Sequence, residues 1–215
     1  MDTEETGRLR VNPVGGGGDR LLVLIHGYGA DENDLAPLAP IIDPDGRFAT
    51  ICPRGPIDIE LGGAAWYDRS TDGMIDQLSF CRSIVLLDRM IDELTDANRF
   101  DPAGTVLIGF SQGAAMTLAL ALRETTRVRP TAVAALSGSI QQPAWFSYDW
   151  DATDLPPVFQ QHGTHDPVVG IDRGHSTRGV LEHHGIDLDY REYPMQHEIS
   201  QASIADLQTW LARVE

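Results

Sequence analysis

The sequence contains no lysine, so all 16 of its basic residues are arginine, and they stand against 32 aspartate and glutamate residues. The resulting formal net charge of -16 repels the phosphates of nucleic acids and the headgroups of anionic membranes. We therefore expect no nucleic acid as a partner. A high-salt cytoplasm and the codon bias of a GC-rich genome both fit this composition, and the sequence does not separate them.

Cysteine and long apolar runs are also scarce. Cys52 and Cys81 are too few and too scattered for a disulfide framework or a zinc site, and their apolar surroundings predict buried thiols. The seven histidines show no zinc-ligand spacing, so we expect no metal and no cofactor. No apolar run approaches the ~18 residues of a membrane span. The charged start, MDTEETGRLR, lacks the apolar core of an export signal, which predicts a cytoplasmic protein without stable membrane insertion.

The order of apolar segments predicts an α/β fold. The sequence has 215 residues, of which 42% are hydrophobic, so we expect one globular domain over residues 1–215. Strand-like segments alternate with segments of helical periodicity, which is typical of a mostly parallel, doubly wound sheet. The predicted strands are 8–11, 20–27, 48–53, 105–109, 131–138, 156–163 and 187–194, and the predicted helices are 32–42, 75–97, 112–122, 172–184 and 198–214. The first two strands, joined by VGGGGD, predict a hairpin and an antiparallel N-terminal edge, and residues 54–75 predict a long surface excursion.

Polar residues follow several of the predicted strands, at the sheet edge where such folds bind ligands. Ser111, Asp166 and His197 come there in the chain order of an α/β-hydrolase triad. Ser111 stands between Gly109 and Gly113, where a nucleophile elbow needs glycine because the backbone turns too sharply for side chains. An N-cap role would explain the serine alone but not both glycines.

These residues have distinct expected roles. Ser111 would be the nucleophile, and His197 would take its proton as general base. Asp166 would orient His197 and stabilise its protonated form. Asp172, six residues further on, is the rival acid, since an Asp-Pro pair such as that at Asp166 is also an ordinary turn initiator.

The remaining candidates concern the oxyanion and the acyl group. A tetrahedral intermediate needs two backbone donors, for which the amides of Tyr28 and Gln112 are candidates. Large apolar side chains in loop-like stretches are candidates for an acyl pocket. They are Trp66, Met74, Trp145 and Phe146. For Met74 and Phe146, a role in covering the core explains the sequence equally well.

Five segments together carry a resemblance to a known family: LIHGYGADENDL, CPRGP…AAWYD, GFSQGAAM, HGTHDPVV and YPMQHEI. They resemble the phospholipase/carboxylesterase family of α/β-hydrolases, which includes the acyl-protein thioesterases and small bacterial carboxylesterases. The resemblance covers residues 20–200 and implies an α/β-hydrolase core with no large lid domain and an acyl groove near Trp66. It implies the triad Ser111, Asp166 and His197, with Tyr28 and Gln112 as oxyanion donors.

Two departures from the family pattern bear on substrate choice. Tyr28 stands where acyl-protein thioesterases typically have a leucine, and Gln196 stands where a glycine usually precedes the catalytic histidine. Both argue against long-chain thioester specificity. We therefore predict a serine carboxylesterase that hydrolyses short- to medium-chain carboxylic esters through an acyl-enzyme on Ser111, with a small-molecule acyl ester as its partner.

Other functions stay open from the sequence. An acyl thioesterase or a lysophospholipase would use the same triad. A non-catalytic small-ligand binder on a hydrolase scaffold is the alternative from a different class. The sequence leaves the oligomeric state open, including a homodimer.

Overall fold

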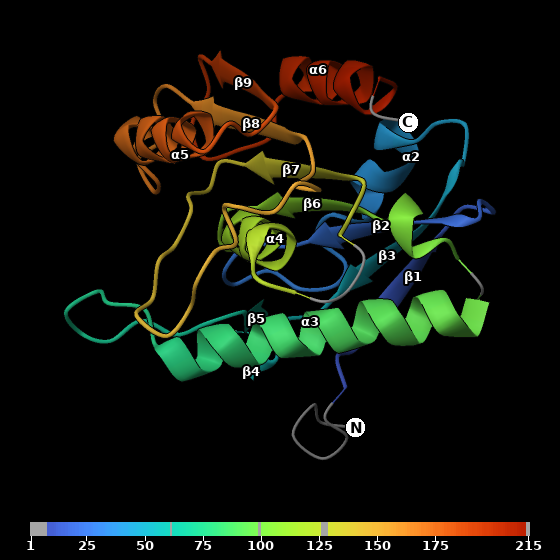
Figure 1. Cartoon of the computed structure of the whole chain (residues 1–215), viewed down its shortest axis with the longest axis horizontal. Helices are drawn as coiled ribbons and strands as arrows, with labels where there is room; N and C mark the ends of the chain where they lie inside the picture. Colours follow the sequence, from blue (N-terminus) through green and yellow to red (C-terminus); the bar gives the residue numbers. More distant parts are fainter. Residues whose placement is uncertain (1–7, 61, 99, 126–128, 214–215) are drawn as a thin grey trace.

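A computed structural model describes residues 8–60, 62–98, 100–125 and 129–213. Its main feature is a seven-stranded sheet of order β1-β3-β2-β6-β7-β8-β9 (Figure 1). The strands are β1 (Val11–Gly15), β2 (Arg20–Ile25), β3 (Phe48–Pro53), β6 (Val106–Phe110), β7 (Ala132–Leu136), β8 (Val158–Gly163) and β9 (Leu188–Tyr193). All neighbouring pairs are parallel except β1 with β3, so the expected mixed α/β sheet with an antiparallel edge is confirmed.

Helices cover both faces of this sheet. The helical segments are η1 (Ala36–Leu38), α2 (Ala39–Ile42), α3 (Gln77–Asn98), η2 (Pro102–Gly104), α4 (Gln112–Leu122), α5 (Ile171–His183) and α6 (Gln201–Leu211). Successive residues of β2 point to opposite faces, as the pleat of a strand requires. Val23 packs in the cluster that contains residues of α3 and α4, whereas Leu24 packs with residues of α2 and α6. Every residue of α4 is buried, because it lies between the sheet, α3 and α5.

The N-terminal strands differ from the prediction in their pairing. Strand β1 begins at Val11 and pairs with β3, so the expected hairpin with β2 does not form. The glycines at 16–18, between β1 and β2, pass close to the backbone at the start of β3 instead of making a tight turn. A Cβ placed on Gly16 would lie 1.8 Å from the carbonyl oxygen of Phe48, and one on Gly18 would lie 1.6 Å from that of Arg47.

Two predicted helices are shorter in the structure. Residues 32–42 form only η1 and the single turn of α2, because Pro37 and Pro40 each lack an amide donor. Helix α6 begins at Gln201 rather than at 198, with Ser200 as its N-cap, which accepts a hydrogen bond from the Ser203 amide at 3.2 Å. The predicted end of this helix, residue 214, lies outside the described residues.

The expected surface excursion at 54–75 contains the short strand pair β4 (Ile57–Asp58) and β5 (Ala64–Ala65). The prediction of buried thiols is confirmed for Cys52, where burial raises the pKa to about 12, whereas Cys81 is half-buried. Within the described ranges, no helix combines the length and the apolar character needed to cross a bilayer.

Candidate active site

Ser111 occupies a sharp turn between β6 and α4. Its backbone has φ 55° and ψ -112°, a left-handed conformation that non-glycine residues rarely adopt. A Cβ on Gly109 would lie 2.2 Å from the carbonyl oxygen of Gly113, and one on Gly113 would lie 2.0 Å from that of Ile25. Both glycines are therefore required by close backbone approach. Ser111 makes no side-chain cap hydrogen bond to α4, so helix capping does not account for its hydroxyl.

The hydroxyl of Ser111 is the first member of a hydrogen-bonded chain. His197 Nε2 lies 2.9 Å from Ser111 Oγ, and His197 Nδ1 lies 2.7 Å from Asp166 Oδ2. The other carboxylate oxygen of Asp166 accepts hydrogen bonds from the amides of Val168 and Val169, both at 2.8 Å. The structure thus brings together the three residues predicted as a triad. The rival acid Asp172 is exposed in the first turn of α5, and among the described residues it has no hydrogen bond to Ser111, His197 or Asp166.

The loop that carries His197 is held against the end of β8. The amide of Thr164 donates to the carbonyl of Tyr193 at 2.8 Å, and the amide of His165 donates to that of Met195 at 3.1 Å. A Cβ on Gly163 would lie 2.3 Å from the carbonyl oxygen of Gln196, so this close packing needs glycine. These contacts fix the imidazole relative to the sheet.

The backbone amides of Tyr28 and Gln112 lie on the two loops that flank Ser111. Gln112 is the first residue of α4, so its amide has no acceptor within the helix. Among the described residues, neither amide donates a hydrogen bond to the protein. A Cβ on Gly27 would lie 3.3 Å from Ser111 Cβ, which places the Tyr28 loop beside the serine. Two free amides next to one hydroxyl can stabilise a negatively charged oxygen.

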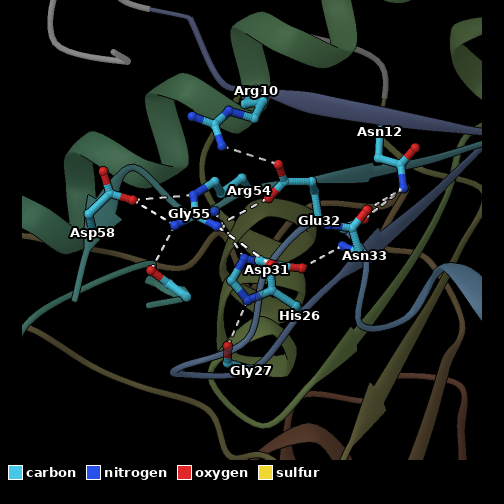
Figure 2. Close-up of polar contacts among 11 residues, drawn as sticks. Arg10, Asn12, His26, Gly27, Asp31, Glu32, Asn33, Arg54, Gly55 and Asp58 are labelled. Atoms are coloured by element: carbon cyan, nitrogen blue, oxygen red, sulfur yellow. Dashed lines mark hydrogen bonds and ion pairs between the residues drawn. The ribbon is translucent and has the colours of Figure 1, made fainter. Parts of the chain in front are cut away.

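The Tyr28 loop rests on a buried histidine. The amide of Gly55 donates to His26 Nε2 at 3.0 Å, and His26 Nδ1 lies 2.7 Å from the carbonyl oxygen of Gly27 (Figure 2). Burial lowers the pKa of His26, with the Gly27 hydrogen bond acting in the opposite direction. The indole of Trp66 donates to the carbonyl of His26 at 2.9 Å and packs against its ring.

Arg54 ties the same loop to its neighbour. Its guanidinium lies 3.3 Å from Glu32 Oε2 and 3.8 Å from Asp31 Oδ2, both on the segment that follows Tyr28 (Figure 2). It also contacts Asp58 Oδ1 at 2.7 Å and donates to the carbonyl oxygen of Gly63 at 2.8 Å. The backbone completes this link, because the Gly29 amide donates to the Ala64 carbonyl at 2.9 Å. Sequence reasoning did not single out Arg54.

A cavity of about 560 Å³ opens over Ser111. It is lined by Tyr28, Tyr67, Asp68, Arg69, Ser111, Gln112, Gly138, Ser139, Gln141, Val168, Val169, Gly170 and Arg173. Tyr67, Arg69 and Arg173 were missed from the sequence. Val168 and Val169 directly follow the Asp-Pro pair, so their place beside the site could have been inferred from that spacing.

The residues expected to form the acyl pocket do not line this cavity. Trp66 is fully buried, because its amide donates to Gln112 Oε1 and its indole to the His26 carbonyl. Phe146 packs edge-on against the core residue Phe80, and Met74 is exposed on its loop. Trp145, also exposed, lines a second hollow of about 490 Å³ that shares Asp68 and Arg69 with the first.

The chain is similar to known proteins in both sequence and fold. Residues 10–215 match the model of the Phospholipase/Carboxylesterase family of α/β-hydrolases. Acyl-protein thioesterase 1 of Candida albicans is 28% identical over 227 residues, covering 93% of this chain and 94% of that protein. Acyl-protein thioesterase 1 of Kluyveromyces lactis is 27% identical over 210 residues, covering 90% and 91%. The crystal structure of esterase PE8 superposes with a TM-score of 0.80 at 26% identity, covering 97% of this chain and 100% of that one.

The chain therefore belongs to the phospholipase/carboxylesterase family. It has the α/β-hydrolase fold of that family, with no large lid evident over the cavity in the described residues. It is a hydrolase of the carboxylesterase type, as the resemblance of its five segments predicted.

Proposed function

We propose that this protein is a serine carboxylesterase that hydrolyses short- to medium-chain carboxylic esters through an acyl-enzyme on Ser111. The observation that carries the proposal is the continuous hydrogen-bonded chain from Ser111 Oγ through His197 to Asp166, with links of 2.9 Å and 2.7 Å. This is the arrangement in which a serine hydroxyl becomes nucleophilic at neutral pH.

Each residue has a defined step in the proposed reaction. Ser111 Oγ attacks the ester carbonyl while its proton passes to His197 Nε2, and the carbonyl oxygen becomes an oxyanion held by the amides of Tyr28 and Gln112. His197 then gives the proton to the departing alkoxide, which leaves as an alcohol. Water gives a proton to His197 as it attacks the acyl-enzyme, and His197 passes that proton to Ser111 Oγ as the bond to the acyl group breaks and the carboxylic acid leaves. Asp166 keeps the imidazole oriented throughout and stabilises its positive charge.

The size of the cavity supports a small acyl group. Its volume of about 560 Å³ is in the middle of the range of small-molecule sites, and most of its lining is polar or aromatic. The relatives from Kluyveromyces lactis and Candida albicans, among others, are named acyl-protein thioesterase 1, which keeps a thioester or lysophospholipid substrate as the second candidate. A panel of esters and thioesters of increasing chain length would separate these candidates.

The experiment compares hydrolysis of 4-nitrophenyl butyrate by the wild type and the Ser111→Ala variant. We expect the variant to lose at least about a thousandfold in kcat, because removing a triad nucleophile leaves only binding and oxyanion stabilisation. Equal rates would refute the proposal. A fluorophosphonate should label the wild type and Ser139→Ala, a second serine of the cavity, but not Ser111→Ala. Failure to label the wild type would favour a non-catalytic ligand binder.

The wider proposal treats residues 1–215 as one catalytic domain that acts in the cytoplasm on a small-molecule acyl ester. The net charge of -16 disfavours binding to anionic membrane surfaces and to nucleic acids, which supports a small-molecule substrate. The triad needs no metal or cofactor for the proposed reaction. A homodimer is compatible with it, and the molar mass in solution would decide between monomer and dimer.

A further inference from the structure

The charged groups in the cavity over Ser111 are unusual for so acidic a chain. Most described arginines form ion pairs with carboxylates. These are Arg8, Arg10, Arg47, Arg54, Arg89, Arg123, Arg129, Arg178, Arg191 and Arg213. Arg69 and Arg173 have no carboxylate within ion-pair distance among the described residues, although the chain has twice as many acidic as basic residues. Both line the cavity that contains Ser111.

The two arginines reach the cavity from distant segments. Arg69 follows β5; it donates to the carbonyl oxygen of Gly73 at 2.9 Å and shares a side-chain hydrogen bond with Tyr67. A guanidinium has five N–H donors, so these two bonds do not use all of them. Arg173 lies in the first turn of α5, one turn from the loop that carries Asp166. No side-chain hydrogen bond of Arg173 is found in the described part of the chain.

Tyr67 lines the same cavity as both arginines and lies beside Arg69. Its ring lies 5.6 Å from the guanidinium carbon of Arg69. Burial raises the pKa of Tyr67, while the charge and a hydrogen bond of Arg69 and the charge of Arg173 act in the opposite direction. Asp68 is the one carboxylate in the lining, so the described lining carries two cations and one anion. This net positive charge contrasts with the net charge of -16 on the whole chain.

We propose that Arg69 and Arg173 select esters that carry a carboxylate, either on the acyl chain or on the alcohol. A cation without a carboxylate partner in a cavity can donate charge-assisted hydrogen bonds to an anionic substrate, and arginine presents its donors in the planar fork that matches a carboxylate. Positive charge within an acidic surface also attracts the anionic ester specifically to the cavity. This inference rests on the proposed esterase function and names the substrate class of the same site.

The test uses two matched pairs of substrates. The 4-nitrophenyl monoester of adipic acid and its methyl ester place the carboxylate, or its neutral equivalent, on the acyl side. Acetates of 4-hydroxybenzoic acid and of its methyl ester place it on the alcohol side. The measured quantity is the ratio of kcat/KM for the anionic ester to kcat/KM for the neutral one. It is compared among the wild type, Arg69→Gln, Arg173→Gln and the double variant.

We expect this ratio to fall by about tenfold in each single variant and further in the double variant, in at least one substrate pair. Arg178→Gln is the matched control, since it removes the same charge from the same helix, where Arg178 pairs with Glu182 at 2.7 Å. Its ratio should match the wild type. For the wild type, KM of the anionic ester should rise with added NaCl while that of the neutral ester stays constant.

A ratio that changes less than about threefold in both substrate pairs, even in the double variant, would overturn the inference. A fall of the same size in Arg178→Gln would overturn it too, because the effect would then come from net charge. The proposed function fails separately, if Ser111→Ala still hydrolyses the neutral esters. The Arg69 and Arg173 variants should be labelled by fluorophosphonate as fast as the wild type, which establishes that their Ser111 sites are intact.

Discussion

Arg54 should position the Tyr28 amide, although it touches neither Ser111 nor the cavity lining. Replacing it with methionine removes the link between the segment 31–32, which follows Tyr28, and the neighbouring loop at Asp58 and Gly63 (Figure 2). Methionine retains most of the apolar stem, so the change removes mainly the charge and its donors.

The expected loss of stability in Arg54→Met follows from how exposed each partner of Arg54 is. The Asp58 side chain is 73% exposed, so this ion pair contributes less than about 1 kcal/mol. The Glu32 side chain is only 12% exposed, but in the variant it would still form its ion pair with Arg10, at 3.4 Å. This second ion pair limits the cost of leaving a buried carboxylate without Arg54. With the lost hydrogen bond to the Gly63 carbonyl, we expect the free energy of unfolding to fall by about 2 kcal/mol.

The effect on catalysis should appear in kcat. Loss of one oxyanion donor costs about 100- to 1000-fold in kcat, so a displaced Tyr28 amide in Arg54→Met should cost about tenfold. KM for 4-nitrophenyl butyrate should change little, because the oxyanion forms only after the substrate binds. Arg10→Gln is the control, since it removes only the 3.4 Å contact of an exposed side chain with Glu32. If Arg54→Met is folded and retains kcat within about twofold, Arg54 does not position the oxyanion loop.

Three further predictions test other parts of the structure. Asp166→Asn should lower kcat about ten-thousandfold in the nitrophenyl assay, because an amide favours the wrong tautomer of His197, and a loss below about tenfold would contradict the triad. In urea titrations, the free energy of unfolding of the wild type should fall by up to about 1.4 kcal/mol per pH unit as the pH falls below 6.5. The reason is that His26 becomes protonated in the unfolded chain, whereas the lowered pKa of His26 keeps the imidazole neutral in the folded protein. The His26→Gln variant should lose less stability over the same pH range. Gly113→Ala should destabilise the protein by more than about 3 kcal/mol, because the added Cβ would lie 2.0 Å from a backbone carbonyl oxygen. Gly179→Ala in α5, whose Cβ would meet no atom within 4 Å, should instead raise the melting temperature slightly. Thermal melts measure both effects.

The central strands could be predicted from the sequence because each is a short apolar run bounded by turn residues. Strand β6 and helix α4 lie within a residue of their expected positions. Strand β1 could not be placed, because its partner β3 is separated from it in the chain by β2 and local sequence does not encode that choice. Asp166 and His197 were identifiable because the C-terminal ends of parallel strands meet at one sheet edge.

The walls of the cavity were beyond sequence reasoning for a different reason. Large apolar residues in loops suggest an acyl pocket, but their exposure depends on polar contacts made across the fold. Polar contacts hold Trp66 in the core, and Phe146 packs against the core residue Phe80. Arg69 and Arg173 line one cavity although 104 positions separate them in the sequence. No local pattern marks a side chain whose role depends on a distant partner.

Gln112 gives a physical reason for the burial of Trp66. Its side-chain oxygen accepts from the Trp66 amide at 2.7 Å, and its side-chain nitrogen donates to the Tyr67 carbonyl at 2.6 Å. These two bonds orient the 66–67 backbone so that the indole reaches the His26 carbonyl and Tyr67 lines the cavity. The amide of the same Gln112 is a proposed oxyanion donor. One residue therefore couples the cavity wall that carries Tyr67 and Arg69 to the backbone that would hold the reacting oxygen, because any shift of that wall must strain the first turn of α4.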